Sequence, residues 1–294
     1  MNFSTIDSQF VSDVAAEIET LRGRSMPPIP SLNTPKNYGT SKQQGAALVR
    51  RGLIWMFFLL VPLGMRYLTR GRELLADDVY EATKKDRRRP VVYLRSFAAD
   101  KQRSETFVDL INSATSGLFY RPSIELKIFQ GLNGNFKRKF GPYIGIAQPA
   151  EFPPCLGTSK CYVENADWKK ALLWMLEQSQ LAVVRIGQGD GIFWELAAAF
   201  LLYPRDRILL VIDPNSVSDK QLADTYSNLS ANLSATFELH FPERFNGSRV
   251  ITFSKGGYAT LHMAGVLTTL LTGNSFGMSI RKATKSIPEV TSFE

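Results

Sequence analysis

The sequence predicts a doubly wound α/β domain with a parallel sheet over residues 90–294, preceded by an N-terminal membrane-anchor helix. In the domain, short apolar runs alternate with helical patterns of about ten residues. The runs are almost continuously apolar, which is typical of strands buried on both faces of a parallel sheet. A strongly apolar segment upstream of the domain predicts the anchor.

The expected strands and helices follow one another along the domain, as in sheets covered by helices on both faces. The strands are apolar runs bounded by charged, glycine or proline residues: 90–97, 141–147, 181–186, 207–212 and 250–253. The helices have apolar residues at helical spacing: 106–114, 123–140, 166–178, 192–202, 218–227 and 259–271. We expect residues 283–294 to form a frayed tail.

Three segments precede the domain. Residues 1–44 are expected to be a mobile tail and linker that begins with a short amphipathic helix, and residues 69–89 a basic connector helix. Residues 45–68 form the expected transmembrane segment. Its centre, Gly52–Met65, carries no charge but is shorter than the ~20 residues of a full span. Arginines that snorkel at both ends would extend it, whereas a buried core helix or an interfacial helix is the alternative.

The basic residues are concentrated next to this segment. The chain has 35 basic and 27 acidic residues, a formal charge of +8, and much of the excess lies between Arg66 and Arg89. This placement predicts contact with membrane lipid, a single-pass location in the cell membrane, and a cytoplasmic C-terminal domain. Nucleic acid is not expected as a partner, because no aromatic residues are interleaved with the basic ones. Two cysteines and two histidines leave little material for a metal site, and no metal or cofactor is expected.

The working site is expected at the carboxyl ends of the strands, where ligands bind in such sheets. Three segments follow strand ends: Arg95–Asp100, which includes Ser96 and Phe97; 147–151, which ends at Glu151; and 187–195. Arg95 and Ser96 could bind phosphate or ribose hydroxyls, and an ion pair of Arg95 with Asp100 is the alternative.

The third segment is the most informative one. Its glycines, which include Gly189 and Gly191, would let the backbone turn tightly and approach a ligand. Asp190 is expected to cap the next helix and to place Glu195 in the first helical turn, where the helix dipole favours a carboxylate. A carboxylate beside the aromatic ring of Trp194 is the pair that cleavage of an N-glycosidic bond requires. The alternative is that Asp190 and Glu195 cap the helix and Trp194 is part of the core.

Two short motifs resemble known families. Residues 189–199 (GDGIFWELAAA) resemble a segment of the nucleoside 2-deoxyribosyltransferases, although Ile192 and Ala198 replace a threonine and a glycine of that pattern. Residues 92–100 (VYLRSFAAD) resemble the first strand and loop of TIR domains. The chain from 91 to 212 is also similar to a group of bacterial membrane-anchored proteins. The first two resemblances imply a flavodoxin- or TIR-like sheet, with Glu195 as the catalytic carboxylate.

Three functions stay open on these grounds. The first is a membrane-tethered enzyme that cleaves or transfers at an N-glycosidic bond of NAD or a related nucleotide; NAD would be its substrate. The second is a module that binds a nucleotide-like small molecule or assembles with further copies of itself, without turnover. The third is membrane disruption by the apolar segment and the helix expected at 259–271. A second carboxylate near Glu195 would favour the enzyme, and the candidates are Asp100, Asp190 and Glu151.

Overall fold

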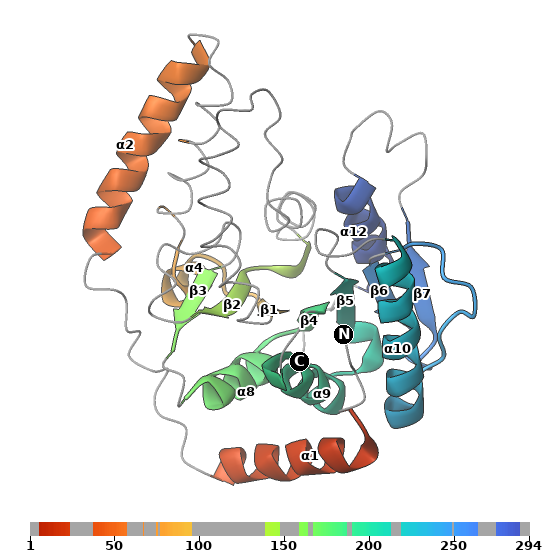
Figure 1. The fold of residues 1–294 in the computed structure, drawn as a ribbon. Coiled ribbons are helices and arrows are strands. Elements are labelled where there is room, and N and C mark those ends of the chain that lie inside the picture. The colour runs from red at the N-terminus through yellow and green to blue at the C-terminus, as the bar shows by residue number, and fades with distance from the viewer. Residues whose placement is uncertain are drawn as a thin grey trace.

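The α/β prediction is confirmed by a computed structural model. The structure describes residues 6–23, 38–57, 67, 75, 77–95, 139–147, 159–163, 167–186, 190–212, 219–248, 250–263 and 275–288. Its strands form one seven-stranded sheet in the order β3-β2-β1-β4-β5-β6-β7 (Figure 1). Their bounds are Val91–Arg95 (β1), Tyr143–Ala147 (β2), Ser159–Tyr162 (β3), Leu181–Ile186 (β4), Ile208–Ile212 (β5), Val250–Phe253 (β6) and Ala259–His262 (β7).

The sheet is mixed, so the prediction of an all-parallel sheet is wrong at one edge. The β3–β2, β2–β1, β1–β4 and β4–β5 pairs are parallel, whereas the β5–β6 and β6–β7 pairs are antiparallel. The five predicted strands lie in the order second, first, third, fourth, fifth, and the last of them, β6, pairs antiparallel with the fourth, β5. The first strand, β1, therefore lies between β2 and β4, at the point where the chain returns from one half of the sheet to the other.

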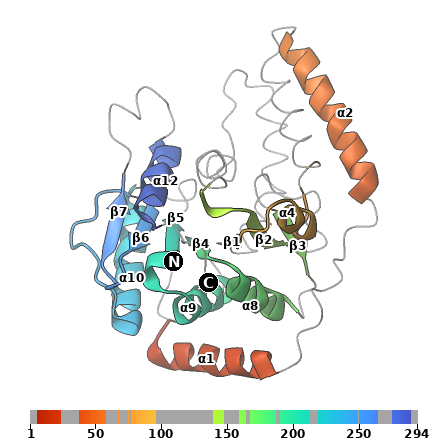
Figure 2. The ribbon, with the colours of Figure 1, turned by 180° about the vertical axis from the view of Figure 1, so that it is seen from behind.

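Helices cover both faces of the sheet. Helices α8 (Trp168–Gln178) and α9 (Asp190–Leu202) lie on one face, and α12 (Ser275–Ser286) lies on the other (Figures 1 and 2). Helix α10 (Asp219–Phe237) contributes apolar side chains on the same side as α9. The strand residues that face α8 and α9 are apolar throughout β1, β2 and β4, as expected for strands buried on both faces.

One glycine fixes the approach of β2 to β1. Gly141, just before β2, has φ +90°, and a Cβ there would lie 3.0 Å from the Cβ of Arg88 and 3.2 Å from the carbonyl oxygen of Arg89. Glycine adopts this backbone conformation without a steric cost. The close approach lets the amide of Val91 donate to the carbonyl of Pro142 at 2.8 Å, where the β1–β2 pair begins.

The N-terminal helix belongs to the fold, and the prediction of a mobile tail is wrong for it. Helix α1 (Ser8–Gly23) packs against α9 on the side away from the sheet (Figure 1). Its apolar side chains Val14, Ile18 and Leu21 are buried in the core shared with α8 and α9. The amphipathic pattern was recognised in the sequence, but an apolar face of three full turns needs a partner surface, and α9 provides it.

Three predictions near the C-terminus are also wrong. Residues 259–262, expected to begin a helix, form strand β7, which pairs with β6. Helix α12 continues to Ser286 and so includes the first residues of the expected frayed tail. Ala283 in this helix and Ile287 just after it are buried against the sheet. Helix α10 extends ten residues beyond its predicted end, to Phe237. The helices expected at 106–114 and over most of 123–140 lie outside the described residues.

The anchor segment is described only in part. Helix α2 (Tyr38–Phe57) includes the first half of the expected span and seven residues of the expected linker. Within the described ranges, no helix combines the length and the apolarity that a bilayer crossing requires. Near the end of α2 the side chains of Leu53 and Ile54 are 57% and 54% exposed, and Trp55 is exposed as well.

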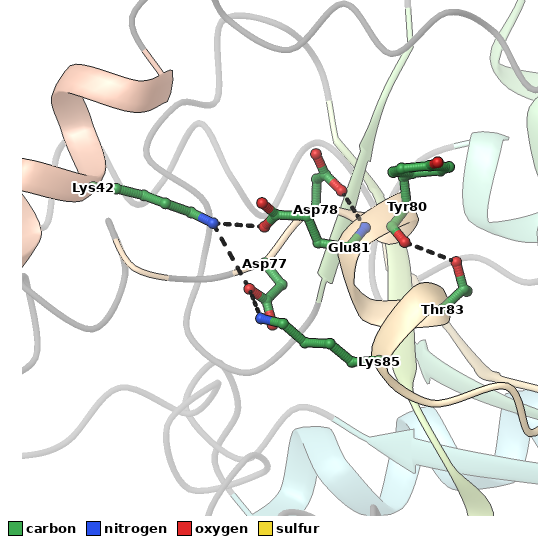
Figure 3. Close-up of polar contacts among 7 residues, drawn as sticks. All are labelled: Lys42, Asp77, Asp78, Tyr80, Glu81, Thr83 and Lys85. Carbon is green, nitrogen blue, oxygen red and sulfur yellow. Dashed lines mark hydrogen bonds and ion pairs between the residues drawn. The ribbon is translucent and has the colours of Figure 1, made fainter.

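A polar cluster joins α2 to the short helix α4 (Val79–Lys85). Figure 3 shows Lys42 of α2 pointing toward two carboxylates: its Nζ lies 2.6 Å from Oε2 of Glu81 and 3.8 Å from Oδ1 of Asp77. Lys85 approaches the same Asp77 oxygen at 2.6 Å, and the side chain of Asp78 caps α4 by accepting from the amide of Glu81. Partly exposed ion pairs of this kind stabilise only weakly.

Candidate functional site

The carboxyl ends of β1 and β4 lie at the topological switch point of the sheet. After β1 the chain adds β2 and β3 on one side, then returns to place β4 on the other side of β1. In open α/β sheets the loops at such a point diverge, and the crevice between them is where ligands bind. The segments that end at Arg95 and Ile186 therefore border the site that the topology predicts.

Two arginines lie side by side at these strand ends. Arg95 is the last residue of β1, and Arg185, in β4, is its Cα partner in the register. Both are buried, with exposed fractions of 4% and 6%. Because side chains alternate along a strand, Arg95 shares a face with Val91 and Tyr93, and Arg185 shares it with Val183. This is the face that α12 covers further along the sheet.

Two buried tyrosines lie on the same face of the sheet as the arginines, nearer the amino ends of the strands: Tyr143 is the register partner of Val91. The rings of Tyr93 in β1 and Tyr143 in β2 have centroids 5.5 Å apart and are tilted by 35°. Burial raises the pKa of the Tyr143 phenol well above its ordinary value, and Tyr93 adds to the rise, whereas Arg95 and Arg185 act in the opposite direction. The phenol of Tyr143 therefore keeps its proton at neutral pH.

Glu195 comes to the same strand ends from α9. Its side chain is 4% exposed and lines a cavity of about 10 Å³ together with Arg95. The other lining residues come from β1, β2 and α8: Tyr93, Leu94, Ile146 and Leu172. A cavity of this size holds about one water molecule. The structure thus brings together two of the residues that the sequence suggested, Glu195 and Arg95, around a space suited to a single water.

The start of α9 differs from the prediction. The helix begins at Asp190, five residues before Glu195, so Glu195 lies in the second turn and not in the first. The effect of a helix dipole falls off within the first turn, and it contributes less here than expected. Gly191 lies within the helix and does not have a positive φ, so the tight turn expected at this position is absent.

Trp194 points away from the cavity, and the prediction that its ring faces a substrate is wrong. Its Nε1 donates to Oε2 of Glu17 in α1 at 2.8 Å. Its ring packs edge-on against Trp168, with centroids 5.5 Å apart, and the ammonium of Lys169 lies 5.1 Å above it. Adjacent helical positions point about 100° apart. With Glu195 turned toward the sheet, Trp194 is directed toward α1, and its role is packing.

The remaining predicted site residues are not placed. Ser96, Phe97, Asp100 and Gly189 lie outside the described residues, as does Glu151, and Asp190 is described only as the first residue of α9. Within the described part of the chain, Glu195 is the one carboxylate that lines the cavity.

Sequence reasoning missed Tyr93, which lines the cavity, Arg185, which is next to Arg95 in the register, and the buried Tyr143 on the same face of the sheet. Each lies inside a predicted strand and was interpreted only as part of that strand. A signal was present, because the strands VVYLR and LAVVRI both interrupt an apolar run with an arginine near the carboxyl end. No protein-family model, curated protein or solved structure matches this chain.

Proposed function

We propose that the chain is a membrane-tethered, cytoplasmic TIR-like domain that cleaves or transfers at an N-glycosidic bond of NAD or a related nucleotide, with Glu195 as the catalytic carboxylate. One observation carries the proposal: Glu195 is buried beside a water-sized cavity at the switch point, next to Arg95. A carboxylate, a positively charged group and a place for water are the components that hydrolysis of an anionic nucleotide requires.

The chemistry needs only one carboxylate when the leaving base is already cationic. The bond between ribose C1′ and the nicotinamide nitrogen breaks, and its electron pair neutralises the ring nitrogen. Glu195 stabilises the ribosyl cation that remains. A water oxygen then forms the new bond to C1′, and the water's proton passes to Glu195 and on to solvent. Nicotinamide leaves without protonation, so a general acid is not required.

A second candidate is a nucleotide-sensing or self-assembling module at the membrane that uses the same site without turnover. The small volume of the cavity favours the self-assembling form of this module, which needs no room for a base or a ribose, since about 10 Å³ holds about one water. In this second candidate function, Glu195 and Arg95 bind and orient a ligand, and no bond of the ligand is broken.

The experiment that separates the two incubates full-length protein in membranes with NAD and measures nicotinamide by chromatography. We expect release by the unmodified protein and a loss of roughly 100-fold or more in Glu195→Gln, which removes the charge and keeps the volume. Glu243→Gln, at an exposed position far along the chain, is the matched control and should release nicotinamide normally. Equal release from Glu195→Gln would reject the catalytic role. Bound NAD without any release would favour the sensing module.

The tether is supported by the end of α2. Arg50 and Arg51 are exposed there, next to the exposed apolar side chains of Leu53, Ile54 and Trp55. Apolar side chains beside cations suit the interface of a membrane that contains anionic lipid. We expect the protein to stay in the pellet when membranes are extracted with alkaline carbonate, and complete release into the supernatant would contradict an inserted segment.

A further inference from the structure

One carboxylate of helix α1 joins the two helices that border the cavity. The side chain of Glu17 accepts from Lys169 of α8, whose Nζ lies 2.8 Å from Oε1 and 2.7 Å from Oε2. The same Oε2 accepts from Nε1 of Trp194 in α9 at 2.8 Å. Glu17 therefore holds α8 and α9 together from the side of these helices that faces away from the sheet (Figure 1).

Aromatic contacts reinforce this junction. The rings of Trp168 in α8 and Trp194 in α9 meet edge-on, with centroids 5.5 Å apart. The ammonium group of Lys169 lies 5.9 Å from the centroid of the Trp168 ring and 5.1 Å from that of Trp194. A cation is attracted to the faces of aromatic rings, so Lys169 contacts both α9 and α1. We call Glu17, Trp168, Lys169 and Trp194 the α1 bridge.

Both helices reach the cavity close to the α1 bridge. Glu195 lines the cavity and directly follows Trp194, and Leu172 lines it from α8, about one helical turn after Lys169. The cavity has a volume of about 10 Å³ and holds about one water. A small displacement of α9 relative to α8 therefore changes whether a water fits beside the Glu195 carboxylate.

We infer that Glu17 is a positioning residue, which fixes the place of Glu195 in the cavity through Trp194 and Lys169. The inference rests on the proposed function, because the group that is positioned is the catalytic carboxylate. The side chains of Glu17 and Lys169 are 40% and 33% exposed, and such ion pairs contribute little to overall stability. Their effect is on geometry, since a displacement of about 1 Å at a reacting group can cost roughly 100-fold in rate.

A second ion pair of α1 supplies a matched control. Nε of Arg22 lies 2.8 Å from Oε1 of Glu177 in α8, and the Arg22 side chain is 42% exposed, close to the value for Glu17. The ion-pair partners of Arg22 are Glu19 and Glu177, so this pair links α1 to α8 and leaves α9 aside. If α1 only stabilises the fold, loss of Arg22 and loss of Glu17 should have similar effects. If Glu17 positions Glu195, the two effects should differ.

The test compares Glu17→Ala with Arg22→Ala in full-length protein in membranes, by release of nicotinamide over a series of NAD concentrations. We expect kcat to fall about fivefold or more in Glu17→Ala. The KM should not change, since Arg95 belongs to β1 and is not moved. In Arg22→Ala, kcat should stay within about twofold of the unmodified protein. Glu17→Gln keeps an acceptor for the indole but loses the ion pair with Lys169, so its kcat should be intermediate.

Two results would overturn the inference: an unchanged kcat in Glu17→Ala, or an equal loss of kcat in Glu17→Ala and Arg22→Ala. If Glu17→Ala does not fold, Glu17→Gln decides the question, because it should still lower kcat more than Arg22→Ala does. An equal kcat in Glu17→Gln and Arg22→Ala would then reject the positioning role.

Hydrogen exchange separates a failure of this inference from a failure of the proposed function. The backbone amides of α9 around Glu195 should exchange faster in Glu17→Ala than in Arg22→Ala, whether or not nicotinamide is released. Faster exchange in a protein that releases no nicotinamide would reject the enzyme and keep the role of Glu17 in placing Glu195. Release of nicotinamide with equal exchange and equal kcat in the two variants would keep the enzyme and reject the role of Glu17. Equal exchange without any release would reject both.

Discussion

The two faces of the sheet differ in what they bury. On the face covered by α8 and α9, the buried strand residues are all apolar, from Val92 and Leu94 in β1 to Ile251 and Phe253 in β6. The face covered by α12 is also apolar at its centre, but it buries six polar or charged strand residues: Tyr93, Arg95, Tyr143, Arg185, Thr252 and His262. The first face provides packing, and the second combines packing with polar groups.

These six residues form two groups that differ in their position in the sheet. Thr252 and His262 lie in the antiparallel hairpin and satisfy each other through a 2.7 Å hydrogen bond. The other four lie in the parallel part of the sheet. Arg95 and Arg185 are at the carboxyl ends of β1 and β4, where α/β sheets bind ligands, whereas Tyr93 is in the middle of β1 and Tyr143 begins β2. Burial of polar groups alone therefore does not mark a site; their position relative to the direction of the strands does.

The comparison predicts the largest loss of stability on the apolar face. Leu173 in α8 has no exposed surface, and Leu173→Ala should lower the free energy of unfolding by about 2–5 kcal/mol, because it removes buried methyl groups and leaves a cavity. Leu201→Ala, at a residue 40% exposed near the end of α9, is the control and should cost less than about 1 kcal/mol. Urea unfolding measures both. Similar losses of unfolding free energy in the two variants would show that the buried Leu173 contributes no more to stability than the partly exposed Leu201.

A smaller effect is expected for Trp194, and it separates packing from binding. Trp194→Phe removes the hydrogen bond to the partly exposed Glu17 and should cost about 1 kcal/mol of stability. The KM for NAD should not change, because the ring points toward α1. Glu17→Gln keeps an acceptor for the indole and should cost less. A KM raised tenfold at unchanged stability would contradict the packing role and return Trp194 to the site.

The strands buried on both faces were the easiest part of the fold to predict. Strand β4, for example, has the predicted bounds, since LAVVRI is an apolar run too short for a helix. Strand β3 was missed because SKCY is a short, half-polar edge strand without such a run. The error at 259–262 has another cause: ATLH is compatible with either structure, and only the pairing with β6 makes it a strand.

The candidate site was predicted only in part, because some of its residues come together only through contacts between distant elements. Glu195 was found because it follows a glycine-rich segment after a strand, a pattern that sequence alone displays. The pairing of Arg95 with Arg185 depends on β1 and β4 being neighbours, although 90 positions separate the two residues in the chain. The direction of Trp194 depends on the packing of α1 against α9, which no local pattern contains.

The smallest expected effect is a pH dependence at the polar pair of the hairpin. Burial lowers the pKa of His262 below its ordinary value of 6.5, and Lys282 of α12 lowers it further. Below pH 6.5 the unfolded chain takes up a proton at His262 before the folded chain does, so folding becomes less favourable as the pH falls toward the folded-state pKa. This contribution is fully present above pH 6.5 and is lost on acidification. His262→Gln, which can still reach Thr252, should reduce the difference in unfolding free energy between pH 7.5 and pH 5.5 by up to about 1 kcal/mol. Chemical denaturation at the two pH values measures this change. If the unmodified protein and the variant show the same pH dependence, the folded hairpin stabilises the imidazolium of His262 as well as water does.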